Sequence, residues 1–313
     1  MRAVREGLRR SLSPMTATAL KPSAFIALLL LACMFASNHI AARIAFDHGV
    51  DVVTAVAVRS LATALVVSLL VVWQGVPLAH TPRHRRFMAL IALLVTFQSV
   101  CLYAAVARMP VGLALLVFNS YPIWATLAAR VLYGRRPERA ALIAMPVILI
   151  GLALALNVVG LLGSADARAQ WSASAPGIGF ALGAGVSFGL VLALTQHEVA
   201  DLDGRVRSAF TMGLVGVLAA VAASATGAWH WPDAPAGWVG LLALTVLYGT
   251  AFTAMFTLLP KLGAVSNSPI LNVEPVAALL LGWLVLGQTV RPLQVAGALI
   301  VVGAVMSLGL RKK

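Results

Sequence analysis

The sequence predicts an all-α membrane protein with ten transmembrane helices arranged as two inverted five-helix repeats. Three observations predict this fold: the hydrophobic composition, the number of long apolar segments, and a repeat that contains an odd number of them. Of 313 residues, 61% are hydrophobic and only 11% are charged, whereas soluble domains carry roughly 25% charged residues. Water therefore cannot be the main solvent of this chain.

Ten long apolar segments are separated by charged, proline or glycine breaks. A helix needs about 20 mostly apolar residues to cross about 30 Å of hydrocarbon. Each segment is predicted to be helical, because backbone groups in lipid must find their hydrogen-bond partners within the segment. The ten predicted spans are roughly 24–46, 53–73, 87–107, 111–132, 140–158, 177–197, 207–226, 237–259, 264–286 and 292–310.

The basic residues are distributed unevenly among the connections. With the N-terminus in the cytoplasm, 17 of the 23 Lys and Arg residues fall on the cytoplasmic side and three on the other. Short cytoplasmic loops of membrane proteins carry such an excess. We therefore expect a multi-pass plasma membrane protein, in a bacterium an inner membrane protein, with both termini cytoplasmic. Orientation and contact with anionic headgroups explain the net charge of +13, so no nucleic-acid partner is expected.

An internal repeat appears when the sequence is compared with itself at an offset of 153 residues. Asn119-Ser-Tyr-Pro122 then aligns with Asn272-Val-Glu-Pro275, and Gly134 aligns with Gly287. Because five is odd, the second repeat would enter the membrane in the opposite orientation, a plan that recurs in secondary transporters with the substrate near the midplane. The predicted organisation is a cytoplasmic basic tail (1–23), a first repeat (24–158), an extracytoplasmic linker (159–176), a second repeat (177–310) and a second basic tail (311–313).

Several short stretches carry a resemblance to a known family. They are Ser37-Asn38 through Arg43, Tyr121-Pro122, Ala264-Val-Ser-Asn-Ser, Glu274-Pro275 and Gly297 through Gly303. The chain beyond residue 24 resembles EamA-type members of the drug/metabolite transporter superfamily, amino-acid exporters among them. This resemblance implies ten helices in two inverted halves and the export of small metabolites. Arg135 and Gln288 stand where the family usually has an acid after each closing glycine.

Two titratable residues fall well inside the predicted spans. Glu274 is the one carboxylate near the middle of a predicted span, and His39 lies in the first span. Polar groups at this depth are costly unless paired or hydrated, and Pro275 and Pro122 each free a backbone carbonyl one turn earlier. We expect a solute site here, with Glu274 and His39 as candidates for proton coupling. A buried structural pair, with Arg59 as the partner of Glu274, is the alternative.

Other candidates are polar or aromatic side chains at similar depth, because tyrosine hydroxyls need partners in lipid. The predicted substrate-binding residues are Asn38, His39, Tyr103, Asn119, Tyr121, Trp124, Tyr248, Phe252, Asn272 and Glu274. Plain helix packing is the alternative for the aromatic ones. Arg43 and Arg59 are expected to snorkel or to pair with Asp47 and Asp51; holding a substrate carboxylate is the alternative. No catalytic residue, cofactor or metal site is predicted.

Three functions stay open. The first is a secondary transporter that exports small metabolites by alternating access; we favour amino acids, aromatic ones included, with drugs or other metabolites as alternatives. The second is an intramembrane serine hydrolase, because Gly185-Val-Ser187-Phe-Gly189 matches a nucleophile-elbow motif that His39 or His197 would serve. Its position within a predicted helix favours close helix packing instead. The third is a passive channel. The expected partners are a small-molecule substrate and the lipid bilayer; the oligomeric state is open, a monomer included.

Overall fold

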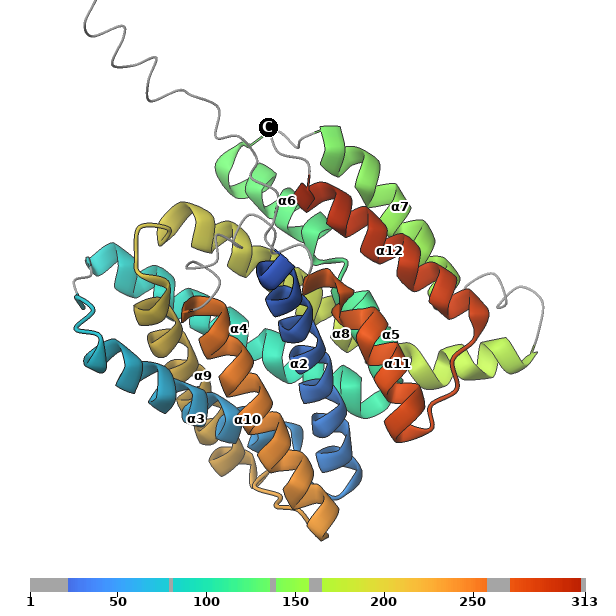
Figure 1. The fold of residues 1–313 in the computed structure, drawn as a ribbon, viewed down its shortest axis with the longest axis horizontal. Helices are drawn as coiled ribbons and strands as arrows, with labels where there is room; N and C mark the ends of the chain where they lie inside the picture. The colour runs from blue at the N-terminus through green and yellow to red at the C-terminus, as the bar shows by residue number, and fades with distance from the viewer. Residues whose placement is uncertain (1–21, 79–80, 136–138, 158–164, 258–270, 311–313) are drawn as a thin grey trace, which may run out of the picture.

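The computed structural model describes residues 22–78, 81–135, 139–157, 165–257 and 271–310, and every regular element in these ranges is helical. In chain order the helices are α2 (Pro22–Asp47), α3 (Val52–Trp73), α4 (Pro82–Arg108), α5 (Val111–Phe118), α6 (Tyr121–Tyr133), α7 (Arg139–Ala155), α8 (Ala165–Glu198), α9 (Gly204–Thr226), α10 (Pro235–Thr257), α11 (Glu274–Leu286) and α12 (Pro292–Leu310) (Figure 1). The all-α prediction is thereby confirmed for the described residues.

Seven helical segments in the described ranges are long and apolar enough to cross a membrane, with α5 and α6 counted together. Three shorter apolar segments, Leu142–Ala155, Leu271–Leu286 and Pro292–Ser307, stand where the fifth, ninth and tenth spans were predicted. The first part of the predicted ninth span, 264–270, lies outside the described residues. Large apolar side chains on the outer faces, such as Leu65 and Val72 of α3, are more than half exposed, which suits a surface that faces lipid.

The predicted fourth span, 111–132, is two helices rather than one. α5 ends at Phe118 and α6 begins at Tyr121, because Pro122 has no N–H to donate to the carbonyl one turn earlier. α11 begins in the same way, with Glu274 directly before Pro275 and a short 3-10 turn ahead of it. Glu274 therefore lies at a helix N-terminus and not in the middle of a continuous helix.

The two helices that begin at these breaks have equal lengths. α6 and α11 contain 13 residues each, and each is followed by a glycine in the left-handed conformation, with φ of 64° at Gly134 and 63° at Gly287. Gly134 and Gly287 are separated by the 153-residue offset of the sequence repeat, so the two helices end at equivalent positions. A difference appears in the predicted linker: α8 begins at Ala165, so 165–176 is helical, and 159–164 lies outside the described residues.

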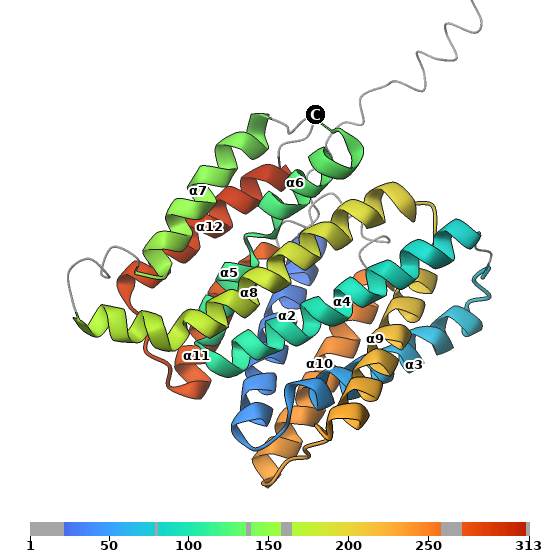
Figure 2. The same ribbon diagram turned by 180° about the vertical axis from the view of Figure 1, so that it is seen from behind.

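The helices of the first half, up to α7, are interleaved with those of the second half, from α8 onward. α3 packs on α9, α4 on α8, α2 on α10, α5 on α11 and α7 on α12, so each pair joins the two halves (Figures 1 and 2). Glycines allow the closest approach: a Cβ on Gly151 would lie 2.9 Å from the carbonyl oxygen of Gly297. A site between the halves is therefore lined by helices from both.

Two apolar cores meet along α2. One core contains the ends of α4 and α5 with parts of α7, α8, α11 and α12. The other joins α3, α9 and α10 to α4 and α8. Ile40 belongs to the first core and the neighbouring Ala41 to the second, so α2 runs between them. Its polar residues, Asn38 and His39, are thus positioned where the two cores adjoin.

Candidate functional site

The structure brings the two predicted titratable residues together. His39 Nε2 on α2 lies 3.3 Å from Glu274 Oε1 at the start of α11. The peptide dipoles at a helix N-terminus favour a carboxylate at that position. The acid of the structural alternative does pair with a neighbouring helix, but its partner is His39 and not Arg59. His39 Nδ1 is buried and has no hydrogen-bond partner among the described residues.

Tyr103 of α4 connects this pair to the rest of the cluster. Its hydroxyl donates to Asn38 Oδ1 at 3.2 Å, and its ring meets the His39 ring edge-on at a centroid distance of 5.7 Å. The Nδ2 atom of Asn38 is buried and finds no hydrogen-bond partner in the described part of the chain. Asn38, His39 and Tyr103 thus form one connected polar group, with donor capacity left unused.

Arg59 of α3 is part of the same cluster, a place that the sequence had offered for it only as an alternative. Its side chain is buried, with 3% of the residue exposed. Its Cζ atom lies 4.4 Å from the ring centroid of Tyr103 and 4.0 Å from that of Tyr248, and Nη1 donates to the Tyr103 hydroxyl at 3.1 Å. The expectation that it would snorkel or pair with Asp47 or Asp51 is therefore wrong.

The distance of Arg59 from the start of its helix could have shown that its side chain is buried. It stands seven residues after Val52, the first residue of α3, which is about 10 Å into the helix at 1.5 Å per residue. Arg43, in contrast, does pair locally, with Nε at 2.8 and 2.9 Å from the Asp47 carboxylate oxygens. Asp51 accepts from the Val53 N–H and caps α3, so both nearby acids have other roles.

Aromatic side chains border the cluster on one side. Tyr248 stacks on Phe252 of the same helix, with centroids 5.4 Å apart, and Phe35 of α2 meets Tyr248 edge-on at 6.3 Å. Arg59 therefore contacts aromatic rings from both α4 and α10. The predicted residues Tyr103 and Tyr248 thus pack on the same guanidinium group.

A second predicted group adjoins the first at the start of α11. The Tyr121 hydroxyl donates to Asn272 Oδ1 at 3.0 Å, and Asn272 is two residues before Glu274. The Tyr121 ring packs against Phe118 and Phe188, with centroids 5.6 and 5.0 Å away. The two helix breaks, one from each half, thus meet at this hydrogen bond.

Two other predicted residues form their hydrogen bonds locally. Asn119 donates through Nδ2 to the Leu115 carbonyl at 2.9 Å, and Trp124 donates through Nε1 to Ser120 Oγ at 3.2 Å. Both contacts support the α5–α6 break. They stabilise the position of Tyr121 without reaching across to the second half.

The comparison with protein-family models decides the family. The model described as the EamA-like transporter family matches residues 22–157 and again residues 175–310. The chain belongs to this family. Its members are membrane transporters of small molecules, so transport rather than catalysis is the activity that membership indicates. The two matches also confirm that the EamA fold occurs here as two repeated halves.

The structural comparison agrees on the fold. A solved structure described only as "Crystal structure of protein" has a TM-score of 0.60 and 17% sequence identity, covering 92% of this chain and 98% of the other. No curated protein sequence matches the chain. At this identity the likeness concerns the fold of the EamA chain alone.

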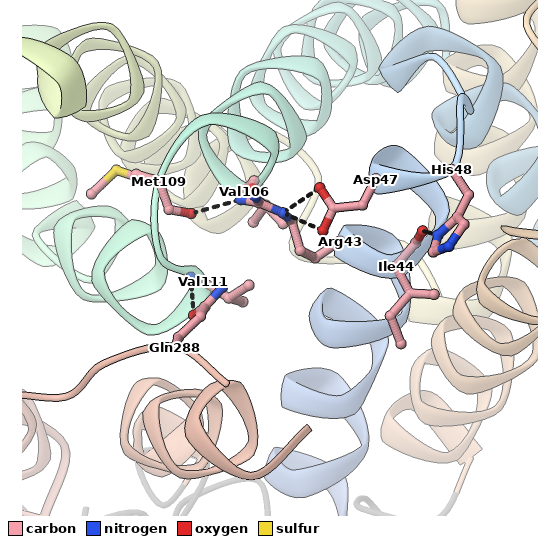
Figure 3. A network of polar contacts seen from close by, with 8 residues as sticks. All are labelled: Arg43, Ile44, Asp47, His48, Val106, Met109, Val111 and Gln288. Atoms are coloured by element: carbon pink, nitrogen blue, oxygen red, sulfur yellow. Dashed lines mark hydrogen bonds and ion pairs between the residues drawn. The ribbon is translucent and has the colours of Figure 1, made fainter. Parts of the chain in front are cut away.

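Polar contacts hold one end of this EamA transporter together (Figure 3). Arg43 Nη1 donates to the carbonyl oxygens of Val106 and Met109 at 3.0 and 3.4 Å, which joins α2 to the end of α4. The N–H of Val111 donates to Gln288 Oε1 at 3.2 Å, which joins the start of α5 to the segment after α11. We call this the Arg43 end.

The opposite end has its own contacts between the halves. Glu198 at the end of α8 accepts from Arg83 Nε at 3.0 Å and from the Tyr133 hydroxyl at 2.9 Å. His84 Nε2 lies 3.2 Å from Asp201 Oδ2. We call this the Arg83 end. The polar cluster around His39 therefore lies in an EamA fold whose two ends are each tied by polar contacts.

Ser187 of the nucleophile-elbow motif has a packing role. Its hydroxyl donates to the Leu94 carbonyl at 2.8 Å, whereas His39 pairs with Glu274 and His197 Nδ1 contacts the Ala193 carbonyl. A Cβ on Gly189 would lie 2.6 Å from the backbone nitrogen of Ala125. The motif thus lets α8 approach α4 and α6 closely in the EamA fold.

Proposed function

We propose that the chain is a secondary transporter that exports small metabolites by alternating access, with amino acids, aromatic ones included, as the substrates. The observation that carries this proposal is the His39–Glu274 pair, 3.3 Å apart with side chains 7% and 21% exposed, within helices of otherwise apolar composition. Ionisable groups at bilayer depth are costly and mark solute or proton pathways. The partly exposed rings of Tyr248 and Tyr121 supply surfaces on which an aromatic side chain can pack.

The helix breaks support the same proposal. Discontinuous helices that meet near the midplane form the substrate sites of many transporters built from inverted repeats. The hydrogen bond between Tyr121 and Asn272 joins the two breaks, and Glu274 follows directly. Glu274 and His39 are the proposed sites of proton coupling, because both can exchange a proton when a solute displaces their contact.

The orientation follows from the charges. The loops at the Arg83 end carry the basic excess, so we place that end in the cytoplasm and the Arg43 end outside it. Both termini would then be cytoplasmic in a bacterial inner membrane. In this orientation the two halves are inverted copies, and export requires the Arg83 contacts and the Arg43 contacts to open in turn.

Purified protein in liposomes tests the proposal. Vesicles loaded with labelled phenylalanine, tyrosine, leucine or alanine are assayed for efflux with and without a pH gradient. We expect saturable flux of at least one amino acid, accelerated when unlabelled solute is present on the far side. The absence of flux for every amino acid would contradict the substrate class and favour drug or other metabolite efflux. Unsaturable flux without acceleration by counter-solute would favour a passive channel.

A further inference from the structure

Arg59 carries a buried positive charge that no acid of the described chain neutralises. We propose that it is the anchor for the carboxylate group of the transported solute, so that the site recognises zwitterions through Arg59 at one end and Glu274 at the other. This inference rests on the proposed function and names the residue that selects the substrate. Its three supports are the distribution of acids, the geometry of the guanidinium and a groove at the next turn of α3.

The acids whose side chains the structure describes are engaged elsewhere. Asp47 pairs with Arg43, Glu198 with Arg83, Asp201 with His84, Asp203 with Arg205 and Glu274 with His39. Asp51 caps α3, and Asp233 lies against Gly49. The segment 258–270, which follows α10, contains no Asp or Glu. A buried cation without a partner is costly, so an anion brought by the solute would be strongly favoured at this place.

The guanidinium is held in a way that leaves donors for such an anion. The rings of Tyr103 and Tyr248 lie 4.4 and 4.0 Å from its Cζ atom, and one Nη1 contact goes to the Tyr103 hydroxyl. The five N–H donors of arginine lie in a single plane and match a carboxylate in a two-pronged contact. The Nε atom is buried and makes no hydrogen bond to any residue that the structure describes.

The negative charge of the site, on Glu274, is connected to Tyr103 through His39. Tyr103 contacts Arg59 through its ring face and His39 through an edge-on contact, and His39 in turn contacts Glu274. A cationic and an anionic side chain are therefore linked through Tyr103 and His39. A solute with both a carboxylate and an ammonium group fits this order of charges, whereas a neutral drug would leave Arg59 without an anionic partner.

A groove borders the next turn of α3 after Arg59, although the Arg59 side chain is not among its lining residues. It has a volume of about 600 Å³, lies between α3 and α10 and is lined in part by Thr63 and Gly249. Thr63 donates to the carbonyl of Arg59, one turn away, and Gly249 follows Tyr248 in the chain. The groove is mostly apolar with several threonines, which suits the side chain of an amino acid more than a second charged group.

Three ligands and four proteins test the inference. The full-length protein in detergent is titrated with phenylalanine, with phenylalaninamide (which lacks the carboxylate) and with N-acetylphenylalanine (which lacks the ammonium), and thermal stabilisation reports the affinity. The variants are Arg59→Gln, Arg59→Lys and, as the matched control, Arg108→Gln. Arg108 is also an arginine of the first half, but its hydrogen bond goes to the Ala104 carbonyl of its own helix.

We expect wild-type protein and R108Q to bind phenylalanine more tightly than phenylalaninamide. R59Q should bind phenylalanine about 10- to 150-fold more weakly, the range for a lost charge-assisted hydrogen bond, with its affinity for phenylalaninamide unchanged. R59K keeps the buried charge without the planar guanidinium group, so its affinity for phenylalanine should fall several-fold. This variant also provides the test if R59Q does not fold. R59Q should also bind N-acetylphenylalanine more weakly than wild type does, because this ligand keeps the carboxylate.

Two outcomes would overturn the inference: a wild-type protein that does not distinguish phenylalanine from its amide, or variants at Arg59 that keep the wild-type ratio. Failure of the proposed function gives a different result. Binding that depends on Arg59 without any flux in liposomes would contradict transport and leave the carboxylate site standing. Amino-acid flux in liposomes, combined with the same ratio of phenylalanine to phenylalaninamide affinity in wild type and Arg59 variants, would support transport and contradict the carboxylate site.

Discussion

The Arg43 end provides a test of alternating access whose magnitude follows from the contacts. Arg43→Met keeps the length of the side chain but removes its donors. The bond from Nη1 to the Val106 carbonyl, at 3.0 Å, is well formed, whereas the 3.4 Å contact to Met109 is weak. One hydrogen bond from a charged donor contributes about 1.5–3 kcal/mol. The contact of Arg43 with Asp47 lies within α2 and persists when α2 moves away from α4, so it does not contribute to the energy of closing.

If the Arg43 end opens by moving α2 away from α4, this loss shifts the equilibrium about 10- to 150-fold toward the open state. The readout is the rate at which a maleimide that cannot cross membranes modifies a cysteine at position 40. Ile40 is 4% exposed and lies one turn from Arg43. Cys33 and Cys101 are replaced by alanine in this background, because they are the two cysteines of the chain.

Arg108→Met is the matched control. Arg108 stands at the same end of α4, but its hydrogen bond goes to Ala104 in its own helix at 3.0 Å. We expect the Arg43 variant to raise the modification rate strongly and the Arg108 variant to leave it near the parental rate. Equal rates in the two variants would refute the view that Arg43 holds this end closed.

Three further predictions concern other parts of the molecule. Ser187→Ala should cost about 1 kcal/mol of stability through the lost bond to the Leu94 carbonyl and leave flux intact; a folded variant without activity would revive the hydrolase interpretation. Gly297→Leu should lower the melting temperature through overpacking against α7, at a cost of about 1–3 kcal/mol or more. Gly303→Leu should not, because no atom of the described residues lies within 4 Å of its Cβ position. Glu274→Gln should abolish acceleration of flux by a pH gradient but preserve exchange, and a wild-type response to the gradient would exclude Glu274 from coupling.

Much of the helical organisation could be predicted from the sequence, because long apolar segments and their breaks are local features. The paired glycines at 134 and 287 fell where the repeat predicted them, since a left-handed turn after a helix favours glycine. The division of the fourth span at Asn119 was not foreseen as a helix end, although Pro122 had been noted. Membrane helices often continue through a proline, so the proline alone did not require two helices.

The site was predicted less completely, because its contacts join residues far apart in the chain. His39 and Glu274 could each be named as titratable residues in apolar segments, but the sequence does not say that α2 and α11 bring them within 3.3 Å. Arg59 was misjudged because its neighbours in the sequence are acids at the end of α2 and before α3. Its actual partners, Tyr103 and Tyr248, come from α4 and α10.

The most direct test of the central claim, that the two halves are inverted copies around this site, is the sidedness of two matched positions. Arg135 and Thr289 are exposed and follow the closing glycines of α6 and α11. Single cysteines at these positions, in the background without Cys33 and Cys101, are labelled in intact cells and in inverted vesicles with the same impermeant maleimide. The account predicts labelling of position 289 from outside and of position 135 from the cytoplasmic face. Labelling of both from one face would contradict it.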